Sequence, residues 1–220
     1  MKKFNKLNNS TDLKKFIQYG NQTIPFLDSE IVKEQVMCDF NYKTRQGKSA
    51  NILDSLILWI NHEIKYAEKK VKFIQKNQFA RTSKEIFESK ITSGCTDYAL
   101  VFATFARQLG YPTTILDTAE FGWCNKLQSN QDYLFHYGHT FCECYFNNEW
   151  VLVDPTCNKI SIDYNPSFIQ LDYSINDSKD FVSFFRGIDY TDSPMLNLES
   201  HNNYMDQSCK EMNLTKLNNK

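Results

Sequence analysis

Apolar residues follow a helical repeat in two stretches of the chain. In residues 52–75 they recur at intervals of three and four, the spacing that keeps side chains on one helix face, so a long helix is predicted. A second stripe occupies residues 95–109, where Gly110 suits the position after a helix end and Pro112 prevents continuation. Because this second stripe is so apolar, the helix that carries it is predicted to be central and buried.

Shorter helices are predicted on either side of these two. Thr82 and Glu85 form a capping box, in which each side chain bonds the backbone of the other residue. The helix that they begin is expected to run through Ser89. Further along, residues 177–186 and part of the polar segment 190–220 also favour helix.

Strands are predicted in the second half of the chain. Residues 139–146 and 149–154 are strand-like, and the two asparagines between them tolerate the positive φ of a tight hairpin turn. Residues 113–116 indicate a short strand. Residues 117–138 are irregular and aromatic, which is typical of a long loop over a site.

The register of the hairpin determines which side chains share a face of the sheet. A two-residue turn pairs Phe146 with Glu149, and continuing along the strands places Phe141 opposite Asp154. His139 lies two residues from Phe141 and shares its face. His139 and Asp154 are therefore predicted to be diagonal neighbours, roughly 7–8 Å apart. A three-residue turn would place them on opposite faces.

Cys95 stands at the start of the second helix, directly after a glycine. A helix N-terminus and a nearby imidazolium both stabilise the thiolate, which is the nucleophilic form of cysteine. His139 and Asp154 complete a set in which histidine moves the thiol proton and the carboxylate orients the imidazole. Such a set attacks the carbonyl carbon of an amide and forms a thioester. The predicted catalytic residues are therefore Cys95, His139 and Asp154.

The reaction also needs hydrogen-bond donors for the tetrahedral intermediate. The backbone N–H of Cys95 is one, and a second is expected in the segment before Cys95 or in residues 117–138. Asp97 is expected to support the site without a catalytic role, since a carboxylate beside the thiolate would raise the thiol pKa. His136 is a rival to His139 but precedes the strand.

Three motifs in this order resemble the transglutaminase-like superfamily of cysteine enzymes. The resemblance spans about residues 52–157 and implies a papain-like, circularly permuted fold with acyl transfer through a thioester. One departure is that glycine directly precedes the cysteine, where the family has Gly-x-Cys. The matching segments are the glycine–cysteine turn at 93–99, the Arg-x-Leu-Gly-x-Pro stretch at 107–112, the histidine strand at 139–145 and the Asp-Pro strand end at 150–156.

The resemblance leaves the acceptor open, because members include crosslinking enzymes, peptidases, amidases and inactive relatives. A chain of 220 residues is too short for the β-sandwich domains of an animal-type crosslinker, so water is the expected acceptor. We expect a hydrolase of the peptidase or amidase type that acts on peptide or protein amides and needs no cofactor. The alternatives are acyl transfer to an amine and a binding module without turnover.

The expected fold class is α+β, with the nucleophile-bearing helix packed on an antiparallel sheet. An N-terminal helical extension at residues 1–50 includes short amphipathic helices at 11–19 and 28–38. The transglutaminase-like catalytic domain is expected at 51–190, followed by a polar tail at 191–220.

Composition limits the partners. The formal net charge is −1 and the sequence pI about 6.4, so no nucleic-acid partner is expected. The N-terminus lacks the apolar core of a secretory signal, and the longest apolar run, residues 56–60, is too short to cross a bilayer. A cytoplasmic location is therefore expected, where most of the seven cysteines would be free thiols. The oligomeric state is left open.

Zinc binding is a second hypothesis for the cysteines. No Cys-x-x-Cys pair occurs, and the hairpin register buries Cys142 and Cys144 among valines, so no metal is expected. His62 and His201 are interpreted as surface histidines of helices. The soft side chains that this hypothesis would require are Cys124, His136, Cys142, Cys144 and Cys157.

Overall fold

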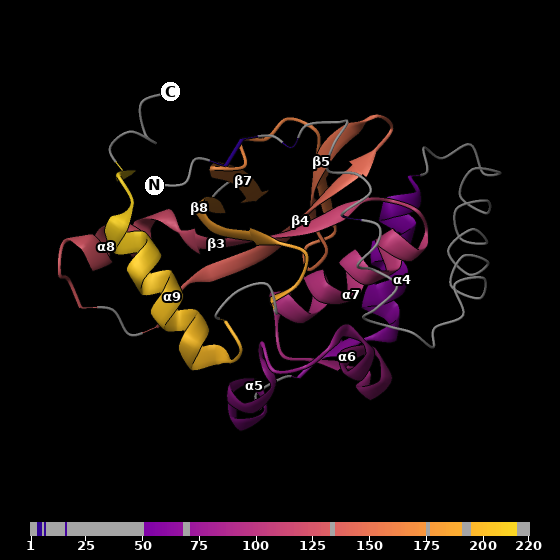
Figure 1. The fold of residues 1–220 in the computed structure, drawn as a ribbon, viewed down its shortest axis with the longest axis horizontal. Coiled ribbons are helices and arrows are strands. Elements are labelled where there is room, and N and C mark those ends of the chain that lie inside the picture. The colour runs from indigo at the N-terminus through magenta and orange to yellow at the C-terminus, as the bar shows by residue number, and fades with distance from the viewer. Residues whose placement is uncertain are drawn as a thin grey trace.

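Helices and an antiparallel sheet make up the fold. In the computed structural model, α4, α6 and α7 pack together beside the sheet, whereas α8 and α9 pack together at its other end (Figure 1). The helices are α4 (Ile52–Glu63), α5 (Val71–Asn77), α6 (Ser83–Ser89), α7 (Cys95–Gln108), α8 (Phe121–Gln128) and α9 (Leu198–Glu211). The structure describes residues 4, 5, 7, 16, 51–67, 71–132, 135–174, 177–190 and 195–214.

Six strands form one sheet in the order β6-β5-β4-β3-β8-β7, and every neighbouring pair is antiparallel. The predicted α+β class is therefore confirmed. Two short strands, β1 (Lys65–Tyr66) and β2 (Ile91–Thr92), form a separate parallel pair. The sheet strands are β3 (Thr113–Glu120), β4 (Gly138–Phe146), β5 (Glu149–Asp154), β6 (Lys159–Ser161), β7 (Phe168–Ser174) and β8 (Asp177–Gly187).

The central helix α7 is as buried as its apolar stripe predicts. Every residue from Thr96 to Arg107 is buried, and the helix packs against α4, α6, β3 and β4. Gly110 adopts a φ of +88° just after the helix, where the N–H of Tyr111 bonds the carbonyl of Ala106. Each large apolar side chain buried here contributes about 1.5–3 kcal/mol.

The helix predicted over residues 52–75 ends early, at Glu63. Ile64 is already extended, with φ −116° and ψ 136°. The next backbone groups bond another segment: the N–H of Lys65 donates to Lys90 and that of Ala67 to Thr92. Strand pairing therefore replaces the helix, while Ile64 and Ala67 remain buried in the same core.

The hairpin is confirmed in both turn and register. Asn147 and Asn148 have φ values of 51° and 67°, as a two-residue turn with positive φ requires. Phe146 pairs with Glu149, and the ladder continues in that register to Cys142. On one face of the hairpin, Cys142 and the residue paired with it, Val153, pack in the main core. On the other face, Phe141 and Leu152 join a second apolar cluster.

Residues 117–138 do not form the predicted long loop. β3 continues to Glu120, whose side chain accepts hydrogen bonds from the N–H groups of Gly122 and Trp123 and so begins α8. Trp123 and Leu127 are buried under this helix. The sequence does not predict this helix, because the helix has only two turns and a weak apolar stripe.

The helix predicted at residues 177–186 is also wrong, because this segment is strand β8, paired with β3. Residues 181–185 are all buried, so both faces of the strand are covered and no two-residue alternation is visible. The C-terminal helix and the capping-box helix at residues 83–89 are confirmed. The helices predicted at 11–19 and 28–38 lie almost entirely outside the described residues.

The proposed division of the chain into three parts remains a prediction. Among the described residues, none of the helices is long and apolar enough to cross a membrane.

Candidate active site

Cys95 is the first residue of α7. Gly94 precedes it as the N-cap with extended backbone and no side-chain hydrogen bond to the helix. The first-turn N–H groups, that of Cys95 included, therefore have no capping side chain, and the positive end of the helix dipole lies beside the thiol. This environment favours a thiolate.

Asp97 fixes the turn that leads into the helix. Its Oδ2 accepts hydrogen bonds from the N–H and the hydroxyl of Ser93, at 2.6 and 2.7 Å, and pairs with Arg81 at 2.5 Å. The N–H and hydroxyl of Ser93 therefore hold the turn at Gly94, in a sequence where glycine comes directly before the cysteine. These contacts give Asp97 the supporting role that was expected.

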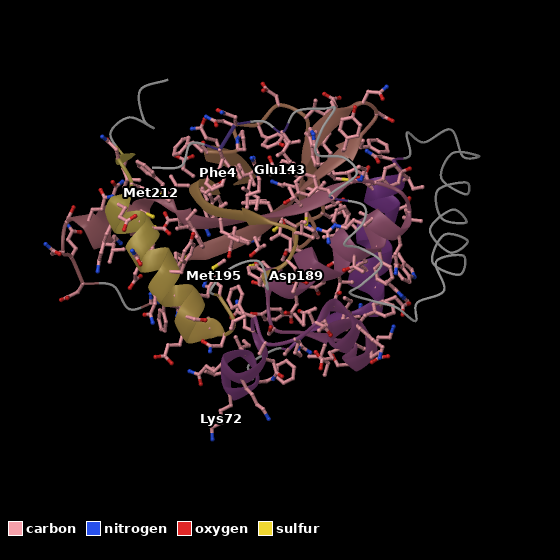
Figure 2. The ribbon with its side chains drawn as sticks, in the orientation of Figure 1. Phe4, Lys72, Glu143, Asp189, Met195 and Met212 are labelled. Atoms are coloured by element: carbon pink, nitrogen blue, oxygen red, sulfur yellow. The ribbon has the colours of Figure 1, made fainter. Side chains whose placement is uncertain are left out.

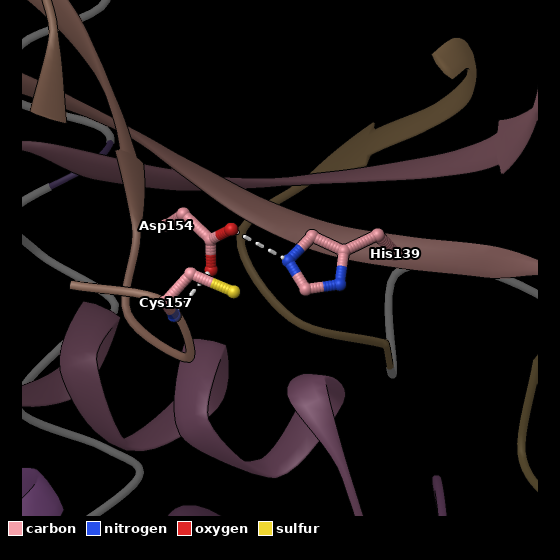
Figure 3. A group of neighbouring side chains, drawn as sticks. All are labelled: His139, Asp154 and Cys157. Carbon is pink, nitrogen blue, oxygen red and sulfur yellow. Dashed lines mark hydrogen bonds and ion pairs between the residues drawn. The ribbon is translucent and has the colours of Figure 1, made fainter. Parts of the chain in front are cut away.

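His139 and Asp154 meet as the hairpin register predicts. Nε2 of His139 lies 2.9 Å from Oδ2 of Asp154 (Figure 3). The other carboxylate oxygen accepts the N–H groups of Thr156 and Cys157, at 3.0 and 3.1 Å. Asp154 is only 2% exposed, so the imidazole is held firmly by Nε2 and its Nδ1 is left for the thiol.

The three side chains form an electrostatic unit. Burial raises the pKa of the Cys95 thiol, but the charge and hydrogen bond of His139 outweigh burial, and the net shift is downward. Burial opposes the charge on His139 as well, yet Cys95 and Asp154 raise its pKa to about 10. Burial raises the pKa of Asp154, but the hydrogen bond and charge of His139, together with the hydrogen bonds from Cys157, outweigh burial and lower the pKa overall. The favoured state is a thiolate–imidazolium pair beside a carboxylate.

A second polar network lies on the other side of the thiol. Sγ of Cys95 is 3.9 Å from the hydroxyl oxygen of Thr140, whose hydroxyl lies 3.1 Å from Oδ1 of Asp117. His201 of α9 lies 2.8 Å from the other oxygen of Asp117. The hydroxyl of Tyr190 is 3.2 Å from that of Thr140. Sequence reasoning missed this network, since its members come from four separate segments.

The other histidines are partly as predicted. His62 is exposed, as expected for a surface histidine. His201 is not: it is 7% exposed and stacks on Phe79, with ring centroids 3.9 Å apart. The one available signal was its place on the apolar face of α9, four residues before the buried Met205. His136 pairs with Asp206, at 2.9 Å.

Two cavities meet at His139. One of about 370 Å³ contains Cys95 and Asp117, and one of about 460 Å³ contains Cys157 and Tyr137. Gly138 and His139 line both. The space beside Cys95 therefore continues on both sides of the histidine.

The cysteines named in the zinc hypothesis do not come together. Cys142 and Cys144 are buried in the main core, as the register predicts, and Cys124 is buried under α8. All six cysteines in the described part of the chain are free thiols. Cys157 is exposed and lies beside His139 and Asp154.

The family model of the transglutaminase-like superfamily matches residues 40–155. The chain belongs to this superfamily. The matched region contains Cys95, His139 and Asp154, whereas Cys157 and α9 lie beyond it.

No curated protein matches the chain. Among solved structures, the chain resembles a candidate cysteine protease from Cytophaga hutchinsonii at 15% identity and a TM-score of 0.45. The alignment covers 84% of this superfamily member and 50% of that protein, so the chain spans half of its length.

Proposed function

We propose that the protein is a cysteine-dependent acyl-transfer enzyme that cleaves amide bonds through a thioester, with water as the acceptor. The observation that carries the proposal is the bond between Nε2 of His139 and Asp154, which leaves Nδ1 for Cys95 at a helix start. The substrate class is a peptide or protein amide in the cytoplasm.

In the proposed mechanism, the thiolate of Cys95 attacks the amide carbonyl carbon. His139 then donates its Nδ1 proton to the leaving amine, and the C–N bond breaks to give a thioester. Water next loses a proton to Nδ1 and attacks the thioester, the C–S bond breaks, and the acid is released with the thiolate–imidazolium pair restored. Asp154 keeps the imidazole in the orientation and tautomer that these transfers need.

Two donors are available for the oxyanion. One is the N–H of Cys95 in the uncapped first turn. The other is the side-chain amide of Gln78, which lies beside Gly94 and lines the same cavity as Cys95. Gln78 precedes Cys95 in the chain but is separated from it by α6 and β2.

The neighbour of Gln78 holds this donor in place. Phe79 adopts a φ of +64°, which is strained for a bulky residue. Its ring stacks on His201 and meets Tyr190 edge-on with ring centroids 4.9 Å apart. Contacts from two distant segments thus stabilise the strained backbone that presents Gln78.

The test is turnover of a panel of peptide and isopeptide amides, with Cys95→Ala as the matched inactive control. Released amine that depends on Cys95 supports thioester formation, released acid supports a hydrolase, and a product joined to an added amine supports transfer. If no amide is cleaved and peptides bind equally to both proteins, the binding-module alternative replaces this proposal. Iodoacetamide should modify Cys95 ahead of the other thiols, and uniform labelling would contradict a nucleophilic role.

A further inference from the structure

We propose that His139, Asp154 and Cys157 bind a zinc ion that inhibits the enzyme reversibly. A ring nitrogen, a carboxylate oxygen and the thiol sulfur of these residues all lie within 4.8 Å of one another (Figure 3). No other group of three such side chains lies this close together in the described ranges. Binding follows from this geometry alone, whereas inhibition rests on the proposed function.

The chain folds so that the thiol returns to the carboxylate. After Asp154, a tight turn directs the N–H groups of Thr156 and Cys157 onto Oδ1 of that same aspartate. Figure 3 shows the Cys157 sulfur pointing toward the His139 ring. Cys157 is exposed and lines the 460 Å³ cavity with His139, so an ion can reach the thiol and the imidazole from solvent, and the buried Asp154 lies 2.9 Å behind the imidazole. This exposure distinguishes it from the buried cysteines of the core.

Two protons occupy the place that the ion would take. Nε2 of His139 and the thiol of Cys157 both direct a hydrogen bond to Asp154. When zinc binds, the N–H and S–H bonds break and bonds from zinc to nitrogen, sulfur and oxygen form. Two protons pass to solvent for each Zn²⁺ bound, so the net charge of the site is unchanged. Charge balance matters because an added buried charge is costly.

The distances suit zinc after small movements. Zn–N and Zn–O bonds of about 2.0–2.2 Å and Zn–S bonds of about 2.3 Å place tetrahedral ligands roughly 3.3–3.8 Å apart. The nitrogen and oxygen start at 2.9 Å, and rotation of the exposed Cys157 side chain adjusts the sulfur. A thiolate, an imidazole and a carboxylate together select zinc over magnesium or calcium, which prefer oxygen ligands alone.

Zinc at this site would remove the general base. Once Nε2 is bound to the ion, His139 no longer donates to Asp154 and no longer becomes an imidazolium beside Cys95. With one ring nitrogen held by the ion, the imidazole can no longer carry a proton between Cys95 and the substrate, and the ion fills part of the cavity that His139 lines, so alkylation and amide cleavage both slow. A chelator reverses the effect, since no covalent bond to carbon forms.

The binding test uses full-length protein with Cys95→Ala, so that it does not depend on turnover. Zinc is titrated against a chromogenic chelator, and cobalt is added separately to detect the charge-transfer band of a bound thiolate. We expect one zinc per chain, release of the Cys157 thiol proton, and a thiolate–cobalt band. Adding C157S replaces the thiol with a hydroxyl that can still donate to Asp154. This change should weaken zinc binding by about 10–100-fold and remove the band. C209S, at a buried thiol in α9, is the matched control and should change neither.

Failure to bind one zinc, or equal affinity in the C157S protein, would overturn the site. Inhibition is tested separately, as the rate of iodoacetamide reaction at Cys95 in the wild-type chain with and without zinc. Zinc should slow the labelling of Cys95, and a chelator should restore the original rate. In the C157S protein, zinc should leave the labelling rate unchanged. If zinc binds as expected but no amide is ever cleaved, the metal site stands and the proposed function fails.

Discussion

Two histidine–aspartate pairs flank Cys95, and their hydrogen bonds are nearly equal in length. His139 and Asp154 are joined at 2.9 Å, and His201 and Asp117 at 2.8 Å. Both aspartates are 2% exposed. What differs is the second ring nitrogen of each histidine.

Nδ1 of His139 is available to the thiol, and two cavities meet at this side chain. Nδ1 of His201 lies 3.4 Å from the side-chain oxygen of Asn202, and its ring is covered by Phe79. The nitrogens of His201 thus face Asp117 and Asn202, whereas His139 directs one nitrogen to Asp154 and the other to the thiol. In the proposed mechanism, the first pair transfers protons, whereas the second pair joins α9 to β3.

The sharpest test of this difference is the loss of each imidazole in turn. His139→Gln should reduce amide turnover by at least about 10⁴-fold, because base and acid are lost together. His201→Gln keeps Nδ1 of His139 and should retain far more turnover than His139→Gln, with a smaller loss because the stack that supports Phe79 beside Gln78 is gone. Steady-state kinetics on the same amide measures both. Equal losses in the two variants would mean that the pairs do not have separate roles.

Removing the charge of Asp154 should have the next largest effect. Asp154→Asn keeps the size of the side chain but no longer stabilises the imidazolium, so turnover should fall by roughly 10²–10⁴-fold. The loss should appear in kcat more than in KM. Asp117→Asn is the matched control in the second pair. A loss confined to KM would place Asp154 in substrate binding instead.

Stability should respond in the opposite order. His201→Gln removes a hydrogen bond to the buried Asp117 carboxylate and the stack on Phe79, so the free energy of unfolding should fall by about 2–3 kcal/mol. His139→Gln, at a more exposed side chain, should cost less. Urea unfolding of both variants checks this. A larger loss for His139→Gln would show that its pair, too, acts mainly as an anchor.

The first pair was predictable from sequence, and the second was not. His139 and Asp154 lie on neighbouring strands of one hairpin, where local turn chemistry fixes the register. Asp117 and His201 are 84 positions apart. Their meeting depends on how α9 docks on the sheet, and no local pattern specifies that docking.

The wrong predictions of helices have the same physical cause, namely contacts between distant segments. The apolar patterns of helix α7 and of the hairpin predict both elements directly. Residues 181–185 of β8 are buried on both faces, so apolar and polar side chains do not alternate there. The helix α4 ends where the following backbone pairs with a distant strand instead. Tertiary contacts decide these segments, as they decide the position of Gln78.

The smallest expected effect is electrostatic and tests whether the second pair influences the thiol at all. The charge of Asp117 raises the pKa of Cys95, against the stronger lowering by His139. Asp117→Asn should therefore move the midpoint of iodoacetamide reaction to lower pH, by less than about one unit. The measurement is made with a chelator present, so that no metal occupies the site. Glu149→Gln removes one negative charge at the far end of the hairpin and should leave the midpoint unchanged, because exposed charges at that range are screened. A shift to higher pH in the Asp117 variant would mean that its carboxylate acts through Thr140 to hold the thiol, rather than through its charge.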